Sequence, residues 1–465
     1  MRTSSDAASA LIVIIPNDGI QSMMLEQIMV GNQWKERENW EQAGEGEEVI
    51  LQGSIYHIRR MGKKWAFILL RMRRKIIQCV YSPEFSRFSL QELKEESCIW
   101  TKARVSKQPG TENGMEYQLL EVKVLSMPEC QSPVALYRRE LQTSLEYLLD
   151  ARPLTLRNAR QRAIFKLQEG ICRAVRTFLQ ERDFTEIHTP KLVFAGAEGG
   201  ANLFSVKYFN RMAYLAQSPQ FYKQMMVGVY ERVYEIGPVF RAEPHDTSRH
   251  LNEYTGIDLE MSYITSFRDV MAIEAELLQA ALKRVKEKYG EQIKELFGQE
   301  VIVPETPFPV VKLADLYKGL EEDFGYVVDD SEKGDLTTEA ERLSYDWVKK
   351  HYNHEFLFVT DYDAEKRAFY HMRDENGVPQ GYDLIWRGVE ITTGAQREHR
   401  YEVLKKQAEE KGLAEDVKFY LEFFQYGCPP HGGFGLGIDR LTMLLVGESI
   451  KDAEFLFRGP NRLTP

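Results

Sequence analysis

The stretch Gly433-Phe434-Gly435-Leu436-Gly437-Ile438-Asp439-Arg440 places a glycine at every second position and ends on an arginine. Glycine has no β-carbon, so such backbone can lie close to a ligand or to a neighbouring strand. From Ile438 onward the apolar residues follow the spacing of one helix face, which puts Arg440 in a first turn, where the helix dipole attracts anions. The stretch therefore predicts a strand that passes into a helix beside a bound phosphate. Close packing of strand and helix is a second explanation for the glycines.

A second arginine, Arg241, lies far upstream in the stretch Phe240-Arg241-Ala242-Glu243. Residues 233–243 and 254–264 each alternate apolar and polar side chains, which predicts an antiparallel hairpin with a long polar loop. Arg241 would lie among carboxylates of this hairpin, and a structural ion pair would explain it. Together with Arg440, however, it predicts a site that holds both ends of a triphosphate, with ATP as the ligand.

A pair of carboxylates predicts a metal site. Residues 382–386 and 389–393 flank a plausible two-residue turn, and that register would pair Asp383 with Thr392 and Ile385 with Glu390. Asp383 and Glu390 would then be diagonal neighbours on one face, roughly 7 Å apart. Carboxylate oxygens suit Mg²⁺, and phosphates can complete its coordination. The alternative is two solvated carboxylates on an exposed face.

The length of 465 residues exceeds what one hydrophobic core usually supports, which predicts two domains. Short β-like runs separated by turn-rich sequence predict a barrel of roughly five strands, of the OB-fold type. Farther along, apolar residues at three- and four-residue spacing predict an amphipathic helix, and β-like runs then alternate with helices. The β-like runs are residues 49–58, 65–70, 75–81 and 117–124, and the helical segments include residues 164–178 and 267–300. The expected organisation is an extension at residues 1–45, the barrel at 46–131, a hinge at 132–153 and the larger domain at 154–465.

Composition places few further limits on the protein. Five widely spaced cysteines without a CxxC pair predict reduced thiols and a cytoplasmic location. We expect no membrane association, because no apolar run approaches the ~20 residues that a spanning helix needs. The net charge of −10 argues against indiscriminate binding of nucleic acid.

The predicted barrel nevertheless carries a local basic face. Residues 49–83 contain no Asp or Glu and eight Lys or Arg residues, which favours contact with phosphates. Trp65 and Phe67 lie in the same stretch and could stack on unpaired bases. A position in the barrel core is the alternative for Phe67.

These features together resemble a class II aminoacyl-tRNA synthetase, and within that class an aspartyl-tRNA synthetase of the archaeal and eukaryotic type. Thr189-Pro190 is similar to the first class motif, Phe240 to Glu243 to the second, and Gly435 to Arg440 to the third. The resemblance spans roughly residues 49–465. The stretches that mark it most specifically are residues 217–224, 247–253, 393–397, 429–437 and 462–465.

The resemblance implies an α+β fold, in which an N-terminal OB-fold barrel precedes a catalytic domain built on an antiparallel sheet flanked by helices. It also implies a homodimer. For ATP, it implies that Arg241 holds the α-phosphate and Arg440 the γ-phosphate end, with Arg249 and His250 helping from the loop. Glu243 would contact the adenine. Asp383, Glu390 and Thr393 would serve Mg²⁺.

The same resemblance implies that L-aspartate and tRNA are the other substrates. Arg397 and Lys223 would grip the β-carboxylate of aspartate, which suits a guanidinium and an ammonium. A solvated surface position is the alternative for Lys223, and a structural ion pair for Arg397. The residues that would fix the aspartate ammonium are Glu198, Gln220 and Asp258. Those that would read the anticodon are Phe67, Gln78 and Glu129.

Several departures from the family pattern leave alternatives open. Ala197 and Ala201 flank Glu198-Gly199-Gly200 where a hydroxyl residue is usual, and Ser54 replaces a common tryptophan of the barrel. Charging of tRNA-Asn as well as tRNA-Asp therefore stays open. Rival interpretations are a tRNA-independent paralogue that forms an amide, an asparaginyl-tRNA synthetase, and a regulatory protein without turnover.

Overall fold

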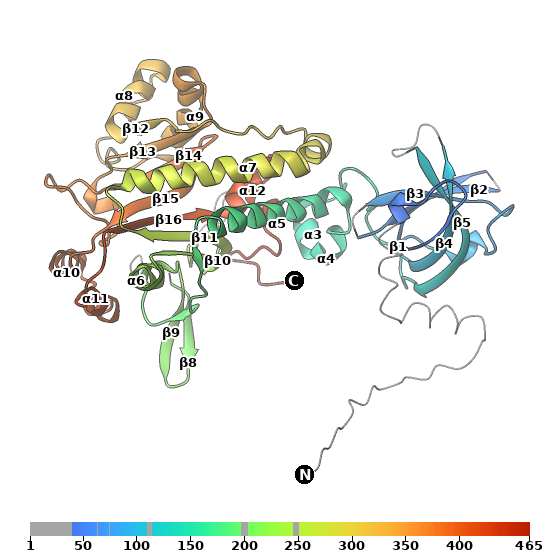
Figure 1. The fold of residues 1–465 in the computed structure, drawn as a ribbon, viewed down its shortest axis with the longest axis horizontal. Helices are drawn as coiled ribbons and strands as arrows, with labels where there is room; N and C mark the ends of the chain where they lie inside the picture. Colours follow the sequence, from blue (N-terminus) through green and yellow to red (C-terminus); the bar gives the residue numbers. More distant parts are fainter. Residues whose placement is uncertain (1–39, 63, 74, 109–113, 197–202, 245–250) are drawn as a thin grey trace, which may run out of the picture. The chain divides into compact units, whose positions relative to one another are not determined.

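The computed structural model describes residues 40–62, 64–73, 75–108, 114–196, 203–244 and 251–465. The chain divides into two compact units, residues 1–137 and 138–465 (Figure 1). Within the described residues, none of the helices combines the length and the apolar content that a bilayer crossing requires.

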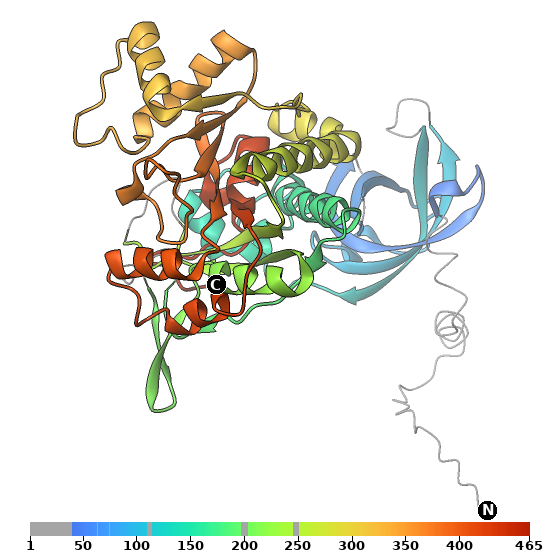
Figure 2. The same ribbon diagram turned by 60° about the vertical axis from the view of Figure 1, so that its left-hand side comes forward.

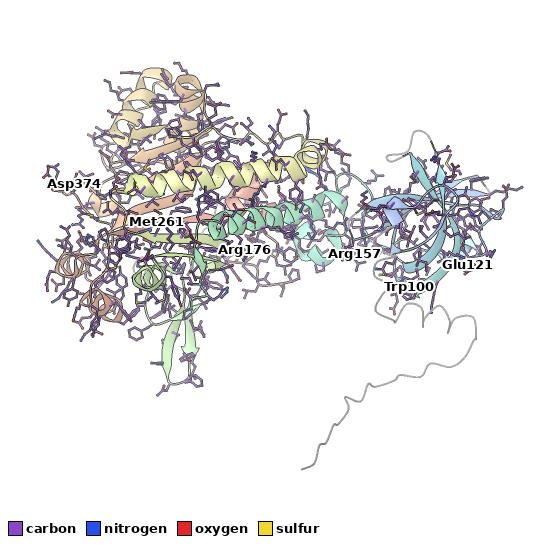
Figure 3. The ribbon with its side chains drawn as sticks, in the orientation of Figure 1. Trp100, Glu121, Arg157, Arg176, Met261 and Asp374 are labelled. Atoms are coloured by element: carbon purple, nitrogen blue, oxygen red, sulfur yellow. The ribbon has the colours of Figure 1, made fainter. Side chains whose placement is uncertain are left out.

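The first unit is a closed barrel with the strand order β1-β2-β3-β5-β4. Its strands are β1 (Glu48–Met61), β2 (Trp65–Arg71), β3 (Ile76–Tyr81), β4 (Cys98–Lys107) and β5 (Met115–Ser126). Figure 3 shows Trp100 and Glu121 on the adjacent strands β4 and β5. Alternate residues such as Leu51, Ile55, Ile68 and Leu70 fill the interior. The predicted five-stranded barrel is confirmed.

The second unit is built on an eight-stranded sheet with the order β12-β13-β14-β15-β16-β11-β10-β6. Its pairs are antiparallel except for β12 with β13 and β10 with β6, which are parallel and lie at the two edges. The strands are β6 (Thr185–Glu186), β10 (Arg232–Phe240), β11 (Glu253–Ser262), β12 (Val310–Lys312), β13 (Phe356–Thr360), β14 (Gly381–Trp386), β15 (Val389–Arg397) and β16 (His431–Gly437). A small second sheet has the order β7-β9-β8, with β7 (Leu192–Val193), β8 (Ser205–Tyr208) and β9 (Arg211–Leu215).

Two long helices run side by side next to the large sheet (Figures 1 and 2). They are α5 (Ala159–Gln180) and α7 (Phe267–Phe297), which confirms both predicted helical segments. A capping box at Ser266 starts α7, and Gly298 in the left-handed conformation ends it. Their apolar faces share one core with β11, β14 and β16. One face of the sheet is thereby sealed by helices.

The remaining helices lie around this framework. They are α3 (Leu145–Asp150), α4 (Arg152–Thr155), α6 (Gln220–Tyr230), α8 (Leu313–Phe324), α9 (Thr338–Tyr352), α10 (Tyr401–Glu410), α11 (Lys418–Phe424), α12 (Ile438–Val446) and α13 (Ile450–Ala453). Short 3₁₀ helices are η1 (Trp40–Gln42), η2 (Leu90–Glu92) and η4 (Ala364–Lys366). The predicted passage from strand to helix is confirmed, because β16 ends at Gly437 and α12 begins at Ile438.

Two details of the predicted strands are corrected. Asp383 pairs with Thr393 rather than with Thr392, although Ile385 pairs with Glu390 as predicted. The register prediction was wrong because a β-bulge interrupts the ladder next to Ile385, and residue alternation cannot reveal a bulge. The predicted hairpin of residues 233–264 is confirmed, but β10 ends at Phe240. Arg241 and Glu243 therefore lie beyond the strand and not on its face.

Candidate active site

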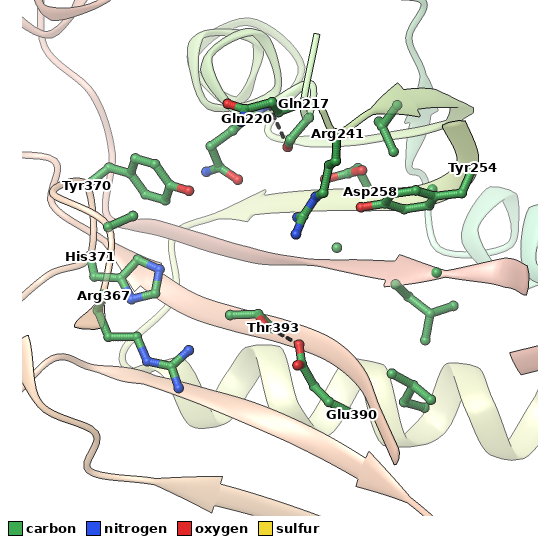
Figure 4. Close-up of a pocket in the computed structure, with 18 of the residues that line it drawn as sticks. Gln217, Gln220, Arg241, Tyr254, Asp258, Arg367, Tyr370, His371, Glu390 and Thr393 are labelled. Atoms are coloured by element: carbon green, nitrogen blue, oxygen red, sulfur yellow. Dashed lines mark hydrogen bonds between the residues drawn. The ribbon is translucent and has the colours of Figure 1, made fainter. Parts of the chain in front are cut away.

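A cavity of about 670 Å³ lies over the centre of the large sheet (Figure 4). Its volume is typical of a site for a small-molecule ligand. Figure 4 shows Arg241 on one side of the cavity and Glu390, Thr393 and Arg367 on the opposite side. Predicted site residues that line it are Gln220, Arg241, Glu243, Asp258, Glu390, Thr393, Arg397 and Arg440. Residues from distant parts of the chain thus converge on one cavity, as the two arginines of the nucleotide prediction require.

Four charged groups at one end form what we call the acid network: Lys223, Asp258, Glu260 and Arg397. The Nζ of Lys223 donates to Asp258 Oδ1 at 2.9 Å and lies 3.4 Å from Glu260 Oε2. Arg397 Nε donates to Glu260 Oε1 at 2.9 Å. All four side chains are buried, and that of Glu260 is 0% exposed. Buried charges are tolerated only when they are paired, and in this network each charge has a partner of opposite sign.

The local sequence explains how these charges meet. Strand alternation on β11 puts Asp258 and Glu260 on one face, while Ile257 and Leu259 enter the core on the other. Lys223 lies in the first turns of α6, whose contact with β11 turns the ammonium toward that face. Arg397 is the last residue of β15. The alternative of a surface position for Lys223 is wrong.

Glu260 is the anion that holds the network together. Burial acts to raise the pKa of Glu260, but the charges of Arg397 and Lys223 lower it, and the net shift is downward. The carboxylate therefore stays ionised between two cations. Glu260 is assigned no role in the sequence analysis, because alternation alone does not show which cations face it.

Lys223 and Arg397 hold different positions relative to the cavity. The ammonium of Lys223 also donates to the carbonyls of Leu259 and Phe434, and Lys223 does not line the cavity. Arg397 does line it. Its NH2 donates to the carbonyl of Gly433 at 2.8 Å, and its NH1 lies 3.4 Å from His371 Nε2. A ligand in the cavity can therefore reach Arg397 directly and Lys223 only through its partners.

His371 is a cavity residue that sequence reasoning missed. It lies outside the named strands, its backbone forms an isolated bridge with Arg397, and its side chain is buried. Burial, and then the charges of Arg397 and Arg367, hold the pKa of His371 well below its usual value, so the imidazole is neutral. Its Nδ1 has no hydrogen-bond partner among the residues that the structure describes. A neutral His371 can accept from Arg397 and so orient the guanidinium.

A chain of amides runs from the cavity wall into the core. Gln220 Nε2 donates to Gln224 Oε1 at 2.7 Å, and Gln224 Nε2 lies 3.0 Å from His431 Nε2. Burial lowers the pKa of His431 to about 4, so this imidazole is neutral and can accept. The chain fixes the side chain of Gln220, one of the residues predicted to contact the aspartate ammonium.

A second group of cavity residues, which we call the phosphate end, comprises Arg241, Glu390, Thr393 and Arg440, with Arg241 across the cavity from Glu390 and Thr393 (Figure 4). Arg440 NH1 donates to the carbonyl of Glu390 at 2.7 Å, and Thr393 Oγ1 donates to Glu390 Oε1 at 2.9 Å. The side chains of Arg440 and Glu390 are 31% and 38% exposed. These charges are more open to solvent than those of the acid network.

Two buried polar residues position the arginines of the phosphate end. Asn252 Nδ2 donates to the carbonyls of Arg241 and Glu243, which fastens the segment beyond β10. Asp439 accepts from the Thr255 amide at 3.1 Å and thereby ties the start of α12, with Arg440, to β11. Both contacts are structural, and each places an arginine that the sequence predicts to bind ATP.

The predicted metal ligands are only partly together. Glu390 and Thr393 line the cavity, whereas Asp383 does not, since both its oxygens accept from Arg367, at 2.9 and 2.6 Å. The alternative of solvated carboxylates is wrong for Asp383, which is buried. Among the described residues, no group of three or more His, Cys, Asp or Glu side chains is arranged to hold a metal ion.

The donor chemistry nevertheless fits Mg²⁺. The candidate ligands are all oxygen donors, which Mg²⁺ prefers. Loss of solvation, and then the charge of Asp383, raises the pKa of Glu390, so the neighbouring Asp383 disfavours the ionisation of Glu390. A divalent cation between Asp383 and Glu390 would relieve that repulsion.

A buried acid supports the strand pair that carries these ligands. Tyr382 Oη donates to Glu274 Oε2 at 2.6 Å, from β14 to α7. Burial raises the pKa of Glu274 to about 8. Glu274 is therefore protonated in the folded protein at neutral pH, directly behind the metal-ligand strands.

The glycines of β16 have two different roles. A β-carbon on Gly433 would lie 1.9 Å from the carbonyl oxygen of Leu259, so Gly433 serves close packing of β16 against β11. A β-carbon on Gly437 would meet nothing closer than Arg440 Cγ at 3.9 Å, and Gly437 lines the cavity. Close packing is therefore found at Gly433, although against a neighbouring strand rather than a helix, and close approach to a ligand stays a prediction for Gly437.

The predicted anticodon residues lie on the barrel. Phe67 is half-buried and outside the barrel core, and the Arg59 guanidinium lies 5.1 Å from its ring centre. Gln78 is its diagonal neighbour on β3 and donates to Glu116 at 3.3 Å. Glu129 is exposed. The barrel-core alternative for Phe67 is wrong, and its aromatic face is backed by a cation.

Three predicted site residues, Glu198, Arg249 and His250, lie outside the described residues. The flanking Ala197 and Ala201 lie outside them as well.

Comparison with known proteins agrees with this geometry. The family model for tRNA synthetases class II (D, K and N) matches residues 144–457. The chain is 42% identical over 422 residues to an aspartate–tRNA(Asp/Asn) ligase of Thermus thermophilus, covering 90% of this chain and 97% of that protein. It is 37% identical to an aspartate–tRNA(Asp) ligase of Thermococcus kodakarensis, with coverage of 90% and 97%.

Solved structures are similar over the same length. Asparaginyl-tRNA synthetase from Pyrococcus horikoshii, complexed with asparaginyl-adenylate, matches with a TM-score of 0.82 at 30% identity and covers 90% of this chain and 97% of that one. Aspartyl-tRNA synthetase from Entamoeba histolytica matches with a TM-score of 0.80 at 28% identity, covering 97% and 96%.

Proposed function

The chain belongs to the class II tRNA synthetases of the D, K and N group, and we propose that it is an aspartate–tRNA ligase. It activates L-aspartate with ATP to aspartyl-adenylate and transfers the aspartyl group to the 3′ end of tRNA. The observation that carries this proposal is Arg397 at the cavity wall, held by the buried Glu260. A fixed guanidinium is suited to a carboxylate side chain and offers no acceptor to an amide.

The negative and the positive group of aspartate bind residues of opposite charge. The β-carboxylate binds Arg397, and Lys223 supports this contact through Asp258 and Glu260. The ammonium binds Asp258, with Gln220 and Glu198 completing its surroundings. Of Arg397's five N–H donors, those on Nε and NH2 already bind Glu260 and Gly433, and His371 Nε2 can accept one from NH1, which leaves the second N–H of NH1 for a ligand.

The first reaction needs no side-chain nucleophile. An oxygen of the aspartate α-carboxylate attacks the α-phosphorus of ATP, the new O–P bond forms, and the bond to the β-phosphate oxygen breaks to release pyrophosphate. Arg241, with Arg249 and His250, neutralises charge at the α-phosphate, Arg440 binds the γ-phosphate end, and Glu243 contacts the adenine. Positioning and charge neutralisation lower the barrier. In the second reaction a terminal ribose hydroxyl of tRNA attacks the activated carbonyl and AMP leaves.

The metal requirement follows from ATP as the substrate. Glu390, Thr393 and Asp383 would hold Mg²⁺, which neutralises phosphate charge when it is bound. The residues' own part is to orient the nucleotide against Arg241 and Arg440.

The barrel supplies the contact with tRNA. Phe67 stacks on an anticodon base, and Gln78 and Glu129 contact others, within a basic surface that binds the backbone. Four relatives that are 40–42% identical are named for both tRNA-Asp and tRNA-Asn. Both tRNAs therefore belong in the charging test.

Assembly and location complete the proposal. We expect a homodimer, as the class resemblance implies. All five cysteines are free, which suits the reducing cytoplasm.

The test is amino-acid-dependent pyrophosphate exchange across all twenty amino acids, followed by charging of total tRNA. We expect exchange with aspartate and charged tRNA-Asp. Exchange with asparagine instead would identify an asparaginyl enzyme. Exchange with aspartate but no charged tRNA would identify the amide-forming paralogue.

A further inference from the structure

Arg367 and Asp383 form a bidentate ion pair beside the cavity. Arg367 NH1 donates to Asp383 Oδ1 at 2.9 Å and NH2 donates to Oδ2 at 2.6 Å. The side chains are only 10% and 9% exposed. The guanidinium also lies 3.6 Å from the ring centre of Tyr362. This geometry is the strongest form of arginine–carboxylate contact, and stacking adds to it.

Of the two residues in this ion pair, Arg367 faces the cavity and Asp383 does not. Arg367, Glu390 and Thr393 line it, whereas Asp383 does not. Arg367 follows directly after η4, in the segment that joins β13 to β14, so it comes from outside the strands that carry the metal ligands. The guanidinium therefore covers the one carboxylate that Mg²⁺ needs beside Glu390.

We propose that Arg367 is the internal counter-cation of Asp383 in the metal-free protein, and that a divalent cation displaces it. The inference rests on the metal site of the proposed function. With Arg367 in place, both oxygens of Asp383 are engaged, and a metal ion would meet a guanidinium at the same carboxylate. After displacement, the guanidinium of Arg367 stays at the cavity wall, where its N–H groups can donate to the phosphates of ATP. Arg367 is thus a positioning residue that links metal loading to nucleotide loading.

Charge balance gives a reason for such a device. Asp383 is buried, and an unpaired buried carboxylate is costly. Arg367 gives this carboxylate a partner until the metal arrives. A merely structural ion pair would have the same geometry but would not exchange with a metal ion, which makes the two cases separable.

The test compares metal-dependent stability in three proteins without nucleotide. In Arg367→Ala, Asp383 loses its partner, and we expect the melting temperature to fall by roughly 5–10 °C. Mg²⁺ should restore most of that loss, while the wild type gains little from Mg²⁺ alone. Arg387→Ala is the matched control, because Arg387 pairs with the buried Glu355 at 3.1 Å, and neither residue lines the cavity. Mg²⁺ should not restore that variant.

Direct metal binding gives the second readout. The Mn²⁺ dissociation constant, measured by electron paramagnetic resonance without ATP, should fall by an order of magnitude or so in Arg367→Ala. Adding Asp383→Asn to that variant should abolish the gain. If Arg367→Ala does not fold, Arg367→Gln serves for the same measurements.

Two outcomes overturn the inference: Mn²⁺ affinity that is unchanged or weaker in the arginine variants, or a melting temperature that Mg²⁺ does not restore. Aspartate-dependent pyrophosphate exchange by the wild type is measured in parallel. Its absence would refute the proposed function, whereas its presence with a failed metal result would refute only the role of Arg367.

Discussion

The two ends of the cavity differ in how far their charged side chains are paired and buried. In the acid network every charge has a partner within the protein, and the side chain of Glu260 is fully buried. At the phosphate end the side chains of Glu390 and Arg440 are about one-third exposed. The acid network is therefore complete without a ligand, whereas we propose that ATP and its metal complete the phosphate end.

This difference suits the two substrates. Aspartate is small, and it must be told apart from asparagine by one carboxylate oxygen. Because the cation is already held in place, ordering it costs little free energy when the ligand binds. This sharpens the discrimination between aspartate and asparagine. ATP is large and brings its own charge and metal, so its end can be looser.

The largest effect should come from removing the anion of the acid network. Glu260→Ala would leave Lys223 and Arg397 buried with less compensation, and we expect a loss of about 3–5 kcal/mol in the free energy of unfolding. Aspartate-dependent pyrophosphate exchange should be abolished. Denaturant titration and the exchange assay measure both effects. Glu339→Ala is the control, since its pair with Arg342 is exposed and should contribute little to stability. A Glu260→Ala protein as stable as that control would contradict a closed network.

The acid behind the metal-ligand strands should give a pH-dependent effect. Folded protein holds a proton on Glu274 up to about pH 8, whereas the unfolded chain releases it near the ordinary value of 4.5. Stability should therefore fall as pH rises from 4.5 to 8, by about 4 kcal/mol from this one group. Glu274→Gln should remove that part of the slope while keeping an acceptor for Tyr382. Melting temperatures of both proteins from pH 5 to 8.5 provide the measurement, and parallel curves would show that Glu274 is not a protonated acid.

An intermediate effect is expected at the phosphate end. Arg440→Ala should raise the KM for ATP roughly 10- to 100-fold and leave the KM for aspartate nearly unchanged. Stability should change by less than in Glu260→Ala, because Arg440 is partly exposed. Steady-state exchange with each substrate varied in turn measures both constants. A rise in the aspartate KM alone would place Arg440 at the wrong end of the cavity.

The smallest effect concerns the orientation of Arg397. His371→Ala should raise the KM for aspartate about tenfold without changing the KM for ATP, because Arg397 NH1 loses its acceptor. The amide of His371→Gln can reach the position of Nε2, so it should restore most of the affinity. Equal KM values in both variants would show that the imidazole only fills space.

Elements with regular patterns were predictable from the sequence, and irregular ones were not. Alternation located β10 and β11, β-like runs located four of the five barrel strands but not β4, and three- and four-residue spacing located α5 and α7. The bulge beside Ile385 carries no periodic signal, so the partner of Asp383 was missed. His371 and Arg367 lie between named strands, where no pattern indicates which side chain faces the cavity.

Roles were harder to predict than positions. The two arginines of the nucleotide site and Arg397 converge on one cavity, as the sequence indicated. The sequence could not show that Lys223 would be enclosed by Asp258, Glu260 and two carbonyls, because these contacts join residues far apart in the chain. Long-range contacts between charged groups depend on the packing of α6, β11 and β15, which local patterns do not encode.

The most direct test of the account is a pair of crystal structures, one of the ligand-free protein and one with Mg²⁺ and a non-hydrolysable analogue of aspartyl-adenylate. We predict that Lys223, Asp258, Glu260 and Arg397 shift by less than about 1 Å between them, while the Arg367 guanidinium leaves Asp383. A rearranged acid network together with an unchanged pair of Arg367 and Asp383 would contradict the account.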